Sequence, residues 1–219
     1  MKHKNNFLLT IVFLHAAVLT AQVQVSKEPM HKKVLENKYI RLLDVWMQPG
    51  DTSMFHIHST PSVFLIFTNT ATISQIKGAQ WEKGQNTAGY SWYRSFINDT
   101  LIHRVGNADT VPFHVTDVEL LSAYKPTEKI KALPFPLLYE NERVFSYQLT
   151  DSSFNNKLIS NRGPIVAELV AGEEVIYYDA IRKRSTNIKT GKYLYIEPGS
   201  SFYLTASGKK MILVLFEIK

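Results

Sequence analysis

The chain contains no cysteine among its 219 residues. No disulfide can therefore stabilise the fold, and no thiolate can act as a nucleophile or bind a metal. Also missing are a glycine-rich phosphate loop, a Gly-x-Ser-x-Gly nucleophile motif, a dinucleotide fingerprint and a His-Glu-x-x-His zinc motif. These absences argue against a nucleotide-binding protein, a serine hydrolase and a helical zinc protease.

Long hydrophobic runs are also scarce, and the longest lies near the N-terminus. It covers Phe7 to Thr20, follows Lys2 and Lys4, and precedes the small residue of Ala21-Gln22. A membrane anchor is the alternative, but the run is shorter than the roughly 20 residues that a spanning helix needs. We therefore predict a signal peptide over residues 1–21 and an exported protein, periplasmic or secreted, with no membrane association after the signal is removed.

Acidic residues are fewer than basic ones, and the formal net charge is +6. Residues 1–21 contain two lysines and no acid, so the chain without them carries +4. The one dense basic cluster is Arg182-Lys183-Arg184. We interpret it as a solvated loop and expect no nucleic-acid partner, because an exported protein rarely meets nucleic acid.

Helical periodicity is nearly absent, and only Thr127 to Leu133 has helical character. Short apolar stretches alternate instead with turn signals such as Pro49-Gly50. This pattern of short apolar stretches and turns predicts an all-β protein built as an antiparallel barrel or sandwich. The predicted strands are Tyr39–Met47, Val63–Phe67, Ala71–Ile76, Tyr90–Ile97, Pro112–Leu121, Val144–Leu149, Ile165–Val170, Val175–Tyr178, Tyr193–Ile196, Phe202–Thr205 and Met211–Ile218.

The two halves of the chain resemble each other. Leu35-Glu36-Asn37 comes directly before a predicted strand, and so does Tyr139-Glu140-Asn141. Near the two ends, Val115–Leu120 parallels Leu213–Ile218. An internal duplication is the natural explanation for this similarity.

Closely spaced prolines from Pro126 to Pro136 separate the halves, and they disfavour both a helix and a central strand. We therefore predict a first domain over residues 22–124, a linker over residues 125–138 and a second domain over residues 139–219.

Histidines are confined to the first half of the chain. His56 and His58 lie two residues apart, and in a strand such residues project from the same face. Two imidazoles side by side offer two ligands to a metal ion. Further along, His103 is followed four residues later by Asn107.

This arrangement resembles the motifs of the cupin superfamily. Gly50, His56 and His58 match its first motif, and His103 and Asn107 match part of its second. The resemblance covers roughly residues 35–121 and reaches the second half only through the internal repeat. It implies two jelly-roll β-barrels in tandem and a divalent metal held by the matched histidines.

The sequence departs from the family pattern at the carboxylate ligand. Ser62 or Val63 stands where the family has glutamate, and the closing glycine of the first motif and the proline and glycine before His103 are missing. A three-histidine site remains, and in this it is similar to the thiol dioxygenases among the cupins. Imidazole ligands alone do not select among Fe, Zn, Ni or Mn. Without the carboxylate the site is more cationic, which favours an anionic substrate or a hydroxide.

We expect the remaining histidines, Asn107 and the second half of the chain to have no part in metal binding. We expect His114 to be structural beside Asp117, His31 to be solvated and Asn107 to be a turn residue rather than a ligand. Aligning the two halves places Ser160 and Arg162 opposite His56 and His58, and Phe202–Thr205 opposite His103. Such residues cannot repeat the metal site, so the second barrel is expected to be structural, with an arginine-lined pocket through Arg162 as the alternative.

Two classes of function follow from these observations. The first is an exported metal-dependent enzyme, dioxygenase-like or isomerase-like, in which His56, His58 and His103 bind the ion and a small organic substrate takes an open position. The alternative is a non-catalytic protein, either a small-molecule binder or a structural bicupin with a vestigial site. A homodimer is compatible with both classes.

The signal-peptide hypothesis predicts that the exported protein begins at or near Gln22. N-terminal sequencing of protein recovered from outside the cytoplasm checks this. An intact Met1 on a membrane-embedded chain contradicts it.

Overall fold

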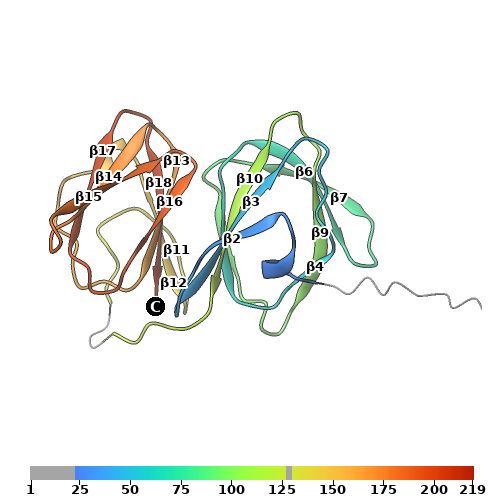
Figure 1. Ribbon diagram of the computed structural model, residues 1–219, viewed down its shortest axis with the longest axis horizontal. Helices are drawn as coiled ribbons and strands as arrows, with labels where there is room; N and C mark the ends of the chain where they lie inside the picture. The colour runs from blue at the N-terminus through green and yellow to red at the C-terminus, as the bar shows by residue number, and fades with distance from the viewer. Residues whose placement is uncertain (1–22, 127–129) are drawn as a thin grey trace, which may run out of the picture.

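The computed structural model describes residues 23–126 and 130–219, so the predicted signal peptide lies outside the described residues. Strands make up nearly all of the regular structure (Figure 1). The only helical elements in the described ranges are two single turns, η1 (Val25–Lys27) and η2 (Asp151–Ser153). No helix in this part of the chain has the length and hydrophobicity to cross a membrane. The predicted all-β architecture is therefore confirmed.

The first half folds into a barrel of two five-stranded sheets. One sheet carries the histidine motifs, and the other packs toward the second half of the chain. The first sheet consists, in spatial order, of β1 (Val23–Gln24), β4 (His56–His58), β9 (Leu101–Asn107), β6 (Thr70–Ile76) and β7 (Trp81–Asn86). The second sheet consists of β2 (His31–Glu36), β3 (Ile40–Met47), β10 (Phe113–Leu120), β5 (Ser62–Ile66) and β8 (Ser91–Arg94).

The second half forms a smaller barrel beside the first, yellow to red in Figure 1. Its inner sheet consists of β11 (Leu137–Glu140), β12 (Val144–Leu149), β18 (Ile212–Ile218), β13 (Ile165–Ala171) and β16 (Lys192–Ile196). Its outer sheet consists of β15 (Arg184–Lys189), β14 (Glu174–Asp179) and β17 (Phe202–Ser207).

The internal repeat is visible in the topology. The order β2-β3-β10-β5-β8 of the first half corresponds, strand for strand, to β11-β12-β18-β13-β16 of the second. The repeated asparagines make the same turn: the Asn37 carboxamide accepts the backbone N–H groups of Tyr39 and Ile40. Asn141 accepts those of Arg143 and Val144 in the same way.

The register between the halves differs by one residue from the alignment made on the sequence. The carbonyl of Pro61 accepts the N–H of Leu120, and the carbonyl of Pro164 accepts the N–H of Ile218. Counting back from these prolines places Ile159 and Asn161, not Ser160 and Arg162, opposite the two histidines of β4. The prediction for the second half was therefore wrong by one position.

The two barrels share one hydrophobic core, which we call the seam. It lies between the sheet containing β3, β5 and β10 and the sheet containing β12, β13 and β18, and the central strands β10 and β18 are buried on both faces. Its buried members are apolar: Ile40, Leu42, Val63, Leu65, Phe67, Val118, Leu120, Val144, Val166, Val170, Val214, Phe216 and Ile218.

One acid is buried beside the seam. Glu168 has no exposed surface, accepts a hydrogen bond from the Thr116 hydroxyl at 3.1 Å, and has its pKa raised to about 8 by burial. A carboxyl with this pKa is mainly neutral at pH 7. The hydrogen bond between Thr116 and Glu168 therefore links the two barrels without burying a charge.

The connection between the barrels departs from the sequence expectation at two points. β11 begins at Leu137, inside the stretch predicted as linker over residues 125–138. The helical character expected for Thr127 to Leu133 is absent from residues 130–133, which are irregular, while residues 127–129 lie outside the described ranges. The nearby prolines, including Pro126 and Pro134, disfavour a helix here.

A cavity in the seam should destabilise the whole chain. Replacing Phe216, which has no exposed surface, by Ala should lower the free energy of unfolding by about 3–5 kcal/mol. Because the core is shared, we expect one cooperative transition in urea for both barrels. The control Ile181→Ala removes a side chain that is 67% exposed and should change stability by less than about 0.5 kcal/mol. Two separated transitions in the wild type would argue against a shared core.

Candidate metal centre

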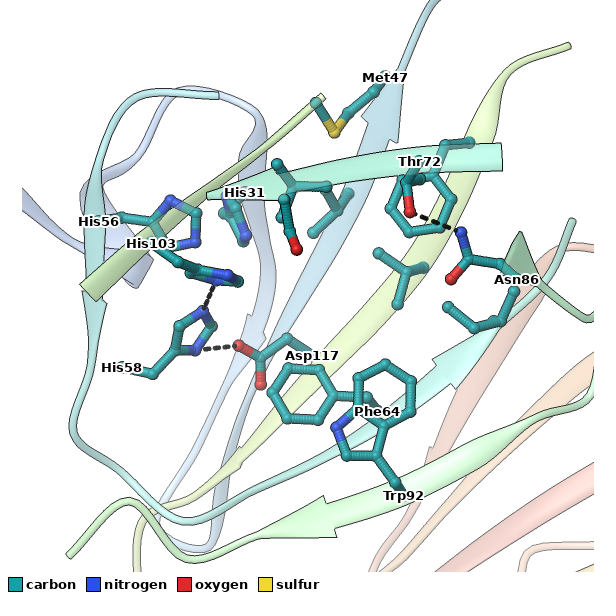
Figure 2. Close-up of a pocket in the computed structure, with 16 residues that line it drawn as sticks. His31, Met47, His56, His58, Phe64, Thr72, Asn86, Trp92, His103 and Asp117 are labelled. Atoms are coloured by element: carbon teal, nitrogen blue, oxygen red, sulfur yellow. Dashed lines mark hydrogen bonds and ion pairs between the residues drawn. The ribbon is translucent and has the colours of Figure 1, made fainter. Parts of the chain in front are cut away.

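Three histidines meet on the inner face of the first barrel. β4 carries His56 and His58, and both side chains are buried because alternate strand residues share a face. β9 pairs with β4 so that His103 lies directly opposite His56. The structure thus brings together the three histidines selected on the sequence (Figure 2).

Their nitrogens face one another at the spacing of metal ligands. Nε2 of His58 lies 3.1 Å from Nε2 of His103, and the ring centroids of His56 and His103 are 4.6 Å apart. Two nitrogens bound to one ion at about 2.1 Å lie roughly 3.0 Å apart at a right angle and roughly 3.4 Å apart at a tetrahedral angle. The observed 3.1 Å falls between these values, so this pair fits a single ion.

The expectation that His31 is solvated was wrong. Its side chain is only 10% exposed, and it supplies a nitrogen that lies within 4.8 Å of ligand atoms of both His56 and His58. His31 begins β2, whose pairing with β3 brings this N-terminal strand to the histidine cluster. No motif spacing marks this residue, so only its place in the sheet reveals it.

In two of the histidines, the nitrogen that faces away from the cluster has an oxygen partner. Nδ1 of His31 lies 2.6 Å from the Glu28 carboxylate, and Nδ1 of His56 lies 2.9 Å from the carbonyl of Met54. Glu28 also accepts the backbone N–H of Met54 at 3.1 Å, which ties the N-terminal turn to the start of β4. Outer partners of this kind fix the tautomer and orientation of metal-binding histidines.

The imidazole nitrogens that face the centre of the cluster show whether a metal ion fits there. Nε2 of His56 is buried and has no hydrogen-bond partner within residues 23–126 and 130–219. A buried nitrogen without a partner is costly, and an ion would satisfy it. The donor set is all imidazole, which suits a divalent transition metal. The residues present therefore fit a metal ion.

The electrostatics also favour metal binding. Burial, together with the neighbouring histidines, lowers the pKa of His56 to about 3 and that of His103 to about 2. Both rings are therefore neutral at pH 7, as coordination requires. Burial alone would raise the pKa of Glu28, but hydrogen bonds from His31 and from the Met54 backbone hold it below its usual value. An anionic Glu28 beside His31 offsets positive charge in the site.

Carboxyl groups reach the site from positions that the motif does not predict. Ser62 donates its hydroxyl to the carbonyl of Thr60 and contributes no acid. Asp117 of β10 faces the cluster instead, with Oδ2 3.4 Å from Nδ1 of His58. With Glu28 and Asp117 nearby, the site is less cationic than the missing glutamate suggested.

A cavity of about 240 Å³ opens beside the histidines. Figure 2 shows the imidazoles at one end, with Phe64 and Trp92 along one wall and Thr72 and Asn86 at the far end. Its walls are otherwise mainly apolar. The remaining lining residues are Val45, Met47, Ile66, Ser74, Val105, Phe113 and Val115.

His114 and Asn107 have structural roles, as their positions outside the cluster show. His114 hydrogen-bonds Asp44 at 2.7 Å and stacks between Phe67 and Trp46. His114 is structural as expected, and it lies on the opposite face of β10 from Asp117, because the two residues are three apart on the strand. The Asn107 carboxamide donates to the carbonyls of Met47 and Val111, which holds the end of β9.

The second barrel has apolar residues where the first has its site. Ile159 bridges to Phe202, as His56 pairs with His103 in the first barrel. Both side chains belong to the core of the second barrel. Arg162 makes an ion pair with the buried Glu217 and donates to the carbonyl of Lys131, so it is a structural residue.

Comparisons with known proteins identify the fold. No protein-family model matches the sequence, and no curated protein matches it significantly. Among solved structures, a Cupin 2 conserved barrel domain protein from Leptotrichia buccalis is similar, with a TM-score of 0.54 and 11% identity over 86% of this chain and 88% of that one.

Two further structures carry enzyme names. The salicylate 1,2-dioxygenase from Pseudaminobacter salicylatoxidans gives a TM-score of 0.54 at 10% identity, over 82% of this chain and 71% of that one. The oxalate decarboxylase from Lactobacillus farciminis gives 0.50 at 12% identity, over 84% and 77%. At such identities the likeness shows the fold: the chain has the cupin fold, with two barrels in tandem.

The lowered pKa of His56 predicts that acid destabilises the metal-free protein. The unfolded chain takes up a proton near the usual histidine pKa of about 6.5, whereas the folded chain does not, so stability is lost as the pH falls below that value. Between pH 7 and pH 5 this residue should account for about 2 kcal/mol of the loss. Urea unfolding at both pH values should show a loss smaller by that amount in His56→Gln. An unchanged pH dependence in the variant would refute this explanation.

Proposed function

We propose that this protein is an exported cupin that binds a divalent metal ion through His56, His58 and His103 and acts on a small organic molecule beside the ion. The observation that carries the proposal is the convergence of buried imidazole nitrogens on the end of a cavity. The composition of residues 1–21 supports export, to the periplasm or outside the cell.

We extend the proposed ligand set to His31. Its Nδ1 is held by Glu28, so its Nε2 is the nitrogen available to an ion. Four imidazoles around an ion of coordination number five or six leave at least one position for water or substrate. A bound ion supplies Lewis-acid polarisation of a substrate oxygen or, if it is iron, activation of oxygen.

A catalytic role is the function we favour. Two structural neighbours are named as enzymes, a salicylate 1,2-dioxygenase and an oxalate decarboxylase, so the cupin fold can support catalysis on small organic molecules. The apolar cavity walls beside the ion would exclude water and hold a substrate. The alternative is a protein that binds a small molecule without turning it over. A screen of small organic compounds with and without a chelator separates the two, because only an enzyme gives turnover that the chelator removes.

The metal hypothesis predicts which histidines matter. Protein purified from its own cell envelope should contain close to one equivalent of a divalent metal by elemental analysis, and His58→Ala should remove most of it. The control His114→Ala removes a buried histidine outside the cluster and should retain the metal. The proposal fails if a triple His56, His58 and His103 alanine variant keeps the wild-type metal content.

The outer partner of His31 gives a finer prediction. Glu28→Gln keeps the size of the side chain but removes the carboxylate that accepts from His31. Loss of such a partner should weaken metal binding by about 10-fold to 100-fold, measured by competition with a chelator of known affinity. The control Glu36→Gln changes an exposed acid at the other end of β2 and should leave metal affinity unchanged.

A further inference from the structure

A buried carboxyl group in the cavity lacks the partners that such a group requires. Asp117 is 2% exposed, and neither of its oxygens has a hydrogen-bond partner in residues 23–126 and 130–219. Oδ2 of Asp117 lies 3.4 Å from Nδ1 of His58, but the geometry of this pair is not that of a hydrogen bond. Buried acids are normally paired or hydrogen-bonded, so this one has unused acceptor capacity.

The fold does not require an acid at this position. β10 alternates between its two faces, with Val118 toward the seam and Asp117 toward the barrel interior. In the second barrel the equivalent residue of β18 is Leu215, which is fully buried in an apolar core. A leucine thus satisfies the same structural position, and the carboxyl of Asp117 needs another explanation.

The space in front of Asp117 has the size and lining for a compact ring. An engineered apolar cavity of roughly 150 Å³ accommodates one benzene molecule. The present cavity of about 240 Å³ is large enough for such a ring with one or two substituents. Phe64 and Trp92, stacked with centroids 4.7 Å apart, form one wall next to Asp117 (Figure 2).

We propose that Asp117 selects the ligand of this cavity by accepting a hydrogen bond from a hydroxyl or amino group on a compact, mainly apolar ring molecule. The ring lies against Phe64 and Trp92, and its polar substituent points toward Asp117 and the histidines. This inference rests on the proposed metal site for the orientation of the ligand. It replaces the earlier expectation of an anionic substrate, because a carboxylate or similar anion offers only acceptors to the two Asp117 oxygens that lack partners.

Three probes of the same shape test the selection. Benzyl alcohol, benzylamine and ethylbenzene have the same number of non-hydrogen atoms, and only the first two carry a donor. Isothermal titration calorimetry on the zinc-loaded protein gives the ratio of each donor probe's affinity to that of ethylbenzene. We expect Asp117→Leu to lower this ratio by about tenfold or more for at least one donor probe, and Asp117→Asn to lower it by less. The two donor probes distinguish a hydroxyl from an ammonium group, because benzylamine is protonated at neutral pH.

Controls separate this role from a purely structural one. Glu119→Gln replaces the next acid on β10, which is paired with Arg41 and does not line the cavity, and should leave the ratio unchanged. If Asp117 only orients His58, its variants lose metal affinity but keep the wild-type ratio, which overturns the inference. The inference is also overturned if the wild type and Asp117→Leu have the same ratio.

The same experiment separates failure of the metal proposal from failure of the proposed ligand selection by Asp117. A wild-type protein that holds no zinc but still discriminates the probes through Asp117 refutes the metal site and leaves the selection intact. A protein that holds zinc without discriminating the probes refutes the selection alone. If Asp117→Leu does not fold, Asp117→Asn supplies the comparison.

Discussion

The docking of the two barrels along the seam is the constraint on which the rest of the structure depends. It commits one face of β3, β5 and β10 to apolar contact with the second half of the chain. Since side chains of a strand alternate, the other face is left to the barrel interior. Val118 in the seam therefore determines that Asp117 lies in the cavity opposite the histidines of β4.

Much of the fold was predictable because buried strands are short apolar stretches that the sequence shows directly. Val144–Leu149 was predicted with the bounds that the structure shows, and the duplication is reproduced strand for strand in the two sheets that pack together. The edge strands β7 and β15 were missed because their residues are mainly polar and exposed, and they pair through the backbone. The one-residue error in aligning the halves arose because a sequence does not show where a residue has been lost between two turns.

The site was predictable to the extent that its residues lie in motifs. His56 and His58 follow from strand alternation, and His103 from its spacing to Asn107. His31 and Glu28 were missed because they come from the N-terminal segment, which reaches the cluster only through β-sheet pairing and one hydrogen bond to Met54.

The two barrels of one chain resemble a dimer whose subunits have been joined, and the joining has a consequence for symmetry. In a dimer of identical one-barrel chains, every substitution appears twice, so a buried histidine cluster would be present in both copies or in neither. In the single chain, Ile159, Phe202 and Leu215 appear once, and the second barrel has an apolar interior while the first keeps its buried polar groups. Covalent linkage thus allows one copy to fill its interior with apolar side chains while the other keeps a buried histidine cluster.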